Sequence, residues 1–172
     1  MKVQIRSGVF ETNSSSTHSI SIDTSERFIK IPKKLVFKAG EYGWEFHRYS
    51  SAEDKASYLF TGIIDAYQKE ETEKYLDIMK EWLEEEGVEE IEFPEITYSE
   101  EGWSSKVNGS DYFYVDHASE LLDFLEWVFQ TKDHLIRFLF SPRSFIATGN
   151  DNSDEELDDE VNYDVERFEK WN

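Results

Sequence analysis

The apolar residues of this chain first change their spacing near Ser51, and this change constrains the fold more than any other feature. In the first third, apolar and polar residues alternate, as at Ile20 and Ile22, which is typical of strands with one buried face. Beyond Ser51, which carries a capping signal, apolar residues recur with a helical period from Ala56 to Tyr67. The pattern therefore predicts strands followed by an amphipathic helix.

The remainder of the chain alternates between helical periods and short apolar runs. The expected elements are a helix over 72–87, a strand over 88–93, a polar loop over 98–109, a strand over 112–115, helices over 121–129 and 131–140, and a strand over 144–147. We therefore expect the α+β class: an antiparallel sheet with three to four packed helices in a single domain.

The domain organisation follows from where the aromatic and acidic residues fall. Residues 1–150 are expected to form one α+β domain, residues 151–160 an acidic linker, and residues 161–172 a C-terminal segment whose aromatic side chains allow it to dock on the domain. Aromatic residues make up 16% of the chain, which is enough to supply a core despite the high charge.

The charge of the chain is strongly negative and unevenly distributed. There are 38 acidic and 18 basic residues, a net charge of −20, and the whole of the excess lies after residue 50, because the first fifty residues are net positive. Such a surface repels phosphates, so direct binding of nucleic acid is disfavoured. Two clusters give the candidate partner-binding residues: Glu84, Glu85, Glu86, Glu89, Glu90, Glu92, Asp154, Glu155, Glu156, Asp158, Asp159 and Glu160.

Two interpretations of these carboxylates remain open. In the first, they form a solvated surface with an acidic tail and serve only to keep the protein in solution. In the second, they occupy a basic groove on a partner protein, where they take the place of phosphates.

The segment 11–19 is the strongest candidate for chemistry because it combines hydroxyl groups, an amide, a carboxylate and an imidazole between two expected strands. The candidate catalytic residues are Glu11, Ser14, Ser15, Ser16 and His18, with the histidine as base, a serine as nucleophile or anion binder, and the glutamate as the orienting group. The alternative is a connection whose hydroxyl groups only cap turns.

Other classes of site lose support from the residue inventory. The chain has no cysteine, which excludes disulfides, thiolate zinc sites and a cysteine nucleophile. Its four histidines show no paired metal-ligand spacing, and it has no glycine-rich phosphate loop. We expect neither a metal nor a cofactor. No apolar run is long enough to span a membrane, so we expect a cytoplasmic protein without a membrane partner.

Four stretches resemble a family of bacteriophage and prophage proteins that has no assigned activity. The first, Arg6-x-Gly-Val-Phe-Glu-Thr-Asn-Ser-Ser-Ser-Thr-His-Ser19, is the most specific, and the others lie at 43–45, 54–59 and 145–152. The resemblance implies a phage setting, hence the host cell cytoplasm, and carries over no catalytic residue. It also implies that the first and last stretches line one shared site, with ligand candidates Asn13, Asn150, Asp151 and Asn152.

These observations lead to one principal hypothesis and two alternatives. The principal one is a phage-encoded acidic accessory protein that binds the basic surface of a host defence or nucleic-acid-handling protein. It inhibits or modulates that host protein by mimicking nucleic acid. The first alternative is a small enzyme or ligand-binding protein centred on residues 11–19. The second is a structural protein whose polar loop only shapes the fold.

Overall fold

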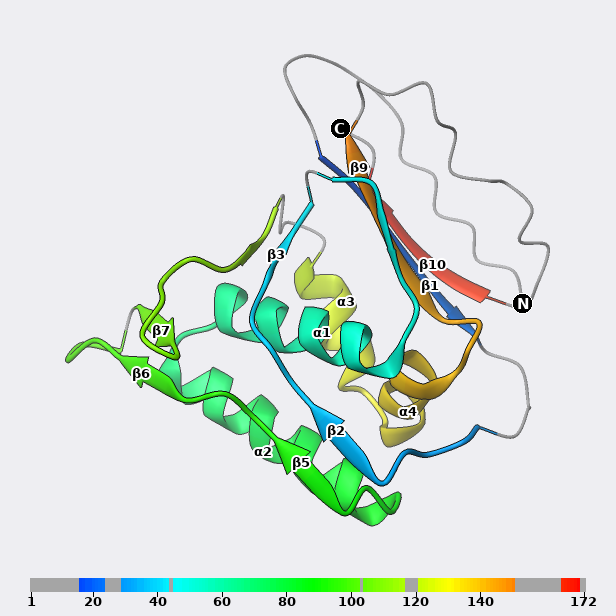
Figure 1. Ribbon diagram of the computed structural model, residues 1–172, viewed down its shortest axis with the longest axis horizontal. Helices are drawn as coiled ribbons and strands as arrows, with labels where there is room; N and C mark the ends of the chain where they lie inside the picture. The colour runs from blue at the N-terminus through cyan, green and yellow to red at the C-terminus, as the bar shows by residue number, and fades with distance from the viewer. Residues whose placement is uncertain are drawn as a thin grey trace.

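The computed structural model of the chain describes residues 16–23, 29–43, 45–102, 104–116, 121–150 and 165–170 (Figure 1). The helices of this part are α1 (Ala52–Ala66), α2 (Lys69–Glu85), α3 (Leu121–Val128) and α4 (Lys132–Phe140). The strands are β1 (Ser16–Asp23), β2 (Lys34–Val36), β3 (Glu41–Tyr42), β4 (His47–Tyr49), β5 (Glu90–Glu92), β6 (Ile96–Tyr98), β7 (Ser105–Val107), β8 (Tyr114–Val115), β9 (Phe145–Asn150) and β10 (Val165–Lys170). The presence of both helices and largely antiparallel strands confirms the α+β class.

The largest sheet has the strand order β10-β1-β9-β4, and all of its pairs are antiparallel. β1 lies in its interior, so that His18 is opposite Thr148 on β9 and opposite Lys170 on β10. Ile20 of β1 pairs with Ile146 of β9, and both side chains are buried. The alternation seen in the sequence therefore places apolar residues of β1 on the face that packs against α4.

Three smaller sheets of two strands each complete the described part. β2 pairs with β5 and β3 pairs with β8, both in parallel, whereas β6 and β7 are antiparallel. The parallel pairs are possible because α1 and α2 lie in the long connections that such pairs require. The expected antiparallel sheet is therefore confirmed in the largest sheet, and the two parallel pairs lie outside it.

Helix α1 runs through the middle of the molecule (Figure 1). Its N-terminus is capped by Ser51, whose hydroxyl oxygen accepts from the backbone N–H of Asp54 at 3.1 Å. All ten residues from Lys55 to Ile64 are buried, because α3, α4, β2 and β8 contact the helix from several sides. The helix predicted from the period of Ala56 to Tyr67 is confirmed, and over these ten residues it is buried on all sides.

Helix α2 is the exposed counterpart of α1. It buries only Thr72, Met79 and Leu83 along one side. It begins at Lys69, three residues before the expected start, because the backbone N–H of Thr72 already donates to the carbonyl of Gln68. The remaining sides of α2 carry most of the charged residues discussed below.

The prediction of a polar loop over residues 98–109 is wrong. Ile96–Tyr98 and Ser105–Val107 pair as the hairpin β6–β7, and a tight turn follows at Asn108 and Gly109, with φ angles of 50° and 81°. Two backbone hydrogen bonds between Val107 and Ser110 close this turn. The dipeptide Asn-Gly is the strongest sequence signal for such a turn, so the signal was present in the chain.

Candidate functional site

Five carboxylates lie in a row along the exposed side of α2. They are spaced by three or four residues, which places them on one face of a helix: Glu70, Glu73, Asp77, Glu81 and Glu84. We call this set the acidic row. At a rise of 1.5 Å per residue it extends for about 21 Å. All five residues are exposed, and they lie away from the side chains that α2 buries.

The acidic row has little compensating charge. Lys69 lies 3.8 Å from Glu73 and Lys80 lies 4.0 Å from Glu84, and both pairs are exposed. Exposed pairs at such distances contribute little to stability. Within the described residues, no cation lies within 4.0 Å of the other three carboxylates. Like charges at this spacing destabilise a helix, so the row is costly for folding alone.

The expected partner-binding cluster at 84–92, by contrast, is mostly paired. Glu84 belongs to the acidic row, and each of the other five carboxylates has a lysine within 3.2 Å. These lysines come from the residue before β2, from β2 and from α4: Lys33 with Glu89, Lys34 with Glu90 and Glu92, and Lys132 with Glu85 and Glu86. These pairs link segments that are distant in sequence. The cluster therefore presents less free negative charge than its sequence indicates.

Lys34 and Lys132 each contact two carboxylates of the cluster, and this pairing changes their pKa values. Hydrogen bonds to Glu92 and Glu90 raise the pKa of Lys34, and hydrogen bonds to Glu86 and Glu85 raise the pKa of Lys132. Both ammonium groups therefore stay charged and keep the cluster partly neutralised over the physiological range. The second expected cluster (Asp154, Glu155, Glu156, Asp158, Asp159 and Glu160) lies outside the described residues.

The candidate catalytic segment is only partly described, since Glu11, Asn13, Ser14 and Ser15 lie outside the described residues, as do Asp151 and Asn152. Ser16 and His18 belong to β1, with Ser16 opposite Asn150 on β9. This register brings the described end of the first stretch next to the described end of the last, as the shared-site hypothesis requires. The backbone from Ser16 onward is part of the sheet ladder, so any anion-binding loop ends before it.

The last stretch of the resemblance has a packing role in the fold. A Cβ atom at Gly149 would lie 2.6 Å from Cε1 of Phe46, so a side chain at this position would displace the ring. The hydroxyl of the neighbouring Thr148 donates to the carbonyl of Glu45 at 2.7 Å. These contacts attach the segment before β4 to β9, and they account for a glycine at 149 without a ligand.

A buried lysine is the feature that sequence reasoning missed. Lys55 is 1% exposed, and its Nζ donates to the carbonyl oxygens of Ser141 and Ser144 at 2.7 and 2.9 Å. The Ser141 hydroxyl in turn donates to Oδ2 of the buried Asp23 at 2.8 Å, and the Ser144 hydroxyl accepts from the Asp23 N–H. The signal available in the sequence was the position of Lys55, four residues before Leu59 on the apolar stripe.

The surroundings of Lys55 shift its proton equilibrium. Burial lowers the pKa of its ammonium from 10.5 to about 8, because the charged form loses its hydration. With 1% of its surface exposed, the amine offers almost no area to a substrate. We interpret the cluster as a polar connection between β1, α1 and the turn that joins α4 to β9.

The described part of the chain offers neither a metal site nor a membrane-spanning helix. No group of three or more histidine, aspartate or glutamate side chains there is arranged to hold a metal ion. None of the helices in the same residues combines the length and the apolar character needed to cross a membrane.

Comparisons with known proteins add no relative: no family model, curated protein or solved structure matches the chain. The site must therefore be argued from its own residues.

Proposed function

We propose that the protein is a binding protein that presents carboxylates to a basic surface of a partner protein, with the acidic row of α2 at the centre of the contact. The row carries the proposal because it holds five exposed carboxylates on one rigid helix with, among the described residues, only two lysine partners, at 3.8 and 4.0 Å. It differs from residues 85–92, where lysines at shorter distances already contact the carboxylates.

The chemistry of the row favours a partner that normally binds phosphates. Carboxylates that recur about every turn of a helix, roughly 5.4 Å, form a line of negative charge on a stiff support. A basic groove would attract this line over a distance of about 10 Å at 0.1 M salt, which makes association fast and sensitive to salt. In the phage setting that the resemblance implies, the partner is a host defence or nucleic-acid-handling protein, and occupation of its groove inhibits or modulates it.

A second candidate function rests on the register of β1 and β9. Ser16 opposite Asn150 places the ends of two polar stretches side by side, which supports a small-ligand or enzyme site with His18 nearby on β1. In that case the acidic row only keeps the protein in solution.

The test compares two triple variants with the same change of charge. The row variant carries Glu70→Gln, Asp77→Asn and Glu81→Gln, and the cluster variant carries Glu89→Gln, Glu90→Gln and Glu92→Gln. Each immobilised protein is exposed to bacterial lysate at low salt and at about 0.5 M salt, where the screening length falls to a few ångströms. Bound proteins are identified by mass spectrometry.

We expect the wild type and the cluster variant to retain the same basic protein at low salt and to release it at high salt, and the row variant to lose it. Equal retention by the row variant, or retention that salt does not weaken, would contradict the proposal. An empty column for the wild type would do so too and would favour the second candidate, which a ligand search with His18→Ala then tests.

A further inference from the structure

The segment that runs from β2 to β3 pairs in parallel with β5 at one end and with β8 at the other, and its backbone pairing is interrupted between them. At one end, the Phe37 N–H donates to the Glu92 carbonyl at 2.9 Å, which extends the β2–β5 ladder by one residue. At the other end, the Tyr114 N–H donates to the Gly40 carbonyl at 3.1 Å, where the β3–β8 pairing begins. Between these points the ladder is missing.

Pro94 explains the interruption. The register pairs Val36 with Glu92, and the rings of Phe37 and Phe93 are 4.5 Å apart, so Pro94 comes next, opposite Lys38. If the parallel ladder continued, the residue at position 94 would donate its N–H to the Phe37 carbonyl, and its own carbonyl would accept from the Ala39 N–H. Proline has no N–H to donate, so the first of these two bonds cannot form.

Two main-chain groups are left without partners at this edge. Among the described residues, nothing donates to the Phe37 carbonyl and nothing accepts from the Ala39 N–H. The N–H groups of Lys38 and Gly40 both donate to hydroxyls of α1, at 3.1 Å each, so alternation directs the Ala39 N–H the other way, toward Pro94. Phe37 is only 2% exposed, and an unpaired carbonyl on so buried a residue is unfavourable.

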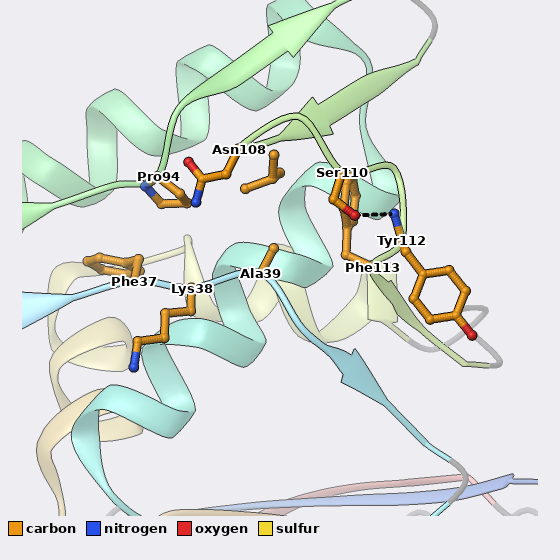
Figure 2. Close-up of a pocket in the computed structure, with 9 residues that line it drawn as sticks. Phe37, Lys38, Ala39, Pro94, Asn108, Ser110, Tyr112 and Phe113 are labelled. Carbon is orange, nitrogen blue, oxygen red and sulfur yellow. Dashed lines mark hydrogen bonds between the residues drawn. The ribbon is translucent and has the colours of Figure 1, made fainter.

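A hollow of about 360 Å³ opens at this interrupted edge (Figure 2). Phe37, Pro94 and Phe113 provide apolar walls, and Asn108 lies across from the strand. The Asn108 Oδ1 already accepts from the Glu95 N–H at 3.1 Å, which leaves its amide nitrogen available as a donor. Figure 2 shows Asn108 reaching toward Pro94 over the hollow. The volume is at the lower end of the range of ligand pockets, so it suits a small molecule.

We propose that this hollow binds a small planar molecule that carries a hydrogen-bond donor beside an acceptor, as an amide or a lactam ring does. The donor satisfies the Phe37 carbonyl, the acceptor takes the Ala39 N–H, and the planar body lies against Phe113 and Pro94. Such a ligand makes the two bonds that a residue other than proline would make at position 94. The site is independent of the acidic row and of the partner proposed for it.

The test uses a matched pair of probes on the full chain. 2-Pyridone has an N–H next to a C=O, whereas N-methyl-2-pyridone has the same ring and carbonyl without the donor. We expect 2-pyridone to move the Ala39 amide resonance downfield in a proton–nitrogen correlation spectrum, with a dissociation constant on the order of 1 mM. The methylated probe should bind about tenfold more weakly, because the Phe37 carbonyl then stays unpaired.

Variants of two prolines give the control within the protein. Pro94→Ala supplies the missing N–H, lets the ladder close and is expected to weaken 2-pyridone binding about tenfold, whereas Pro142→Ala, at an exposed turn, leaves it unchanged. If Pro94→Ala loses its dispersed spectrum, Asn108→Gly replaces it, because glycine keeps the positive φ and removes only the amide; it should weaken binding several-fold. An unmoved Ala39 resonance, equal shifts from both probes, or wild-type affinity in the variant used would overturn the proposal.

Discussion

The Nζ atom of Lys55 lies 2.7 Å from the carbonyl oxygen of Ser141, and both residues are 1% exposed. The contact joins the first turn of α1 to the turn that follows α4, 86 residues later. A second acceptor, the carbonyl of Ser144, lies 2.9 Å from the same nitrogen. A neutral amine can still donate to both carbonyls, so the connection persists when the lysine loses its proton.

The buried lysine should make the stability of the protein depend on pH. Its pKa of about 8 in the folded state is lower than the 10.5 of the unfolded chain, so between these values the unfolded state binds a proton that the folded state lacks. The free energy of unfolding should therefore rise from pH 8 to pH 10.5, by up to about 3 kcal/mol from this group. Urea unfolding of wild type and Lys55→Met at pH 7, 8, 9 and 10 measures the difference.

The Lys55→Met variant should lack this rise, and parallel pH profiles for the two proteins would contradict the assignment. The comparison does not extend beyond pH 10, because buried tyrosines change the stability in the opposite sense there. Burial raises the pKa of Tyr42 and Tyr58, so the unfolded state loses their protons first and the folded state is destabilised as the pH increases further.

Gly149→Ala should destabilise the protein through a steric contact. The new methyl group would meet Phe46 at 2.6 Å, and relief requires a shift of the ring or of β9. We expect a loss of about 1–3 kcal/mol in the free energy of unfolding, as for other overpacked sites. The double variant with Phe46→Leu should recover part of this loss, and a Gly149→Ala protein as stable as wild type would show that the ring moves freely.

The row variant with Glu70→Gln, Asp77→Asn and Glu81→Gln should fold at least as stably as the wild type. Each like-charge pair four residues apart on a helix costs about 0.2–0.5 kcal/mol, and the variant removes these pairs from α2. The gain should be visible in thermal unfolding at low salt and should vanish at high salt, where charges are screened. A variant that is less stable at low salt would mean that these carboxylates have structural partners.

The turn at Asn108 should discriminate between alanine and glycine. Asn108 has a φ of 50°, where a Cβ atom costs about 1–2 kcal/mol, and its Oδ1 compensates by accepting from the Glu95 N–H at 3.1 Å. Asn108→Ala loses that bond and keeps the cost, whereas Asn108→Gly removes both. We therefore expect the alanine variant to have the lower melting temperature, and the reverse order would contradict the geometry of the turn.

The sequence predicted those parts of the fold that depend on local pattern. The helical period from Ala56 to Tyr67 located α1, and the alternation at Ile20 and Ile22 located β1, because each pattern reflects one buried face. The burial of Lys55 could not be predicted in the same way, since it depends on the turn between α4 and β9, which contributes both acceptors from residues distant in the sequence.

In the candidate site too, features set by local sequence pattern can be predicted, and features set by distant residues cannot. The spacing of acids on α2 is local, so the acidic row can be recognised from the sequence once the helix is placed. The pairing of the 84–92 cluster is not local: Lys33 lies 56 residues from Glu89, and only the parallel pairing of β2 with β5 brings them together. Counts of charge along the chain therefore overestimate the free charge of that cluster.

The interior position of β1 determines when the largest sheet can form during synthesis. Residues 16–23 are synthesised before both neighbours of this strand, because β9 and β10 follow helices α1 to α4 in the chain. The pairing of His18 with Lys170 joins residues that are far apart in the sequence, and contacts of such separation slow folding. The helices can pack before β9 and β10 are synthesised, whereas β1 has neither neighbour until then and needs protection from aggregation in the meantime.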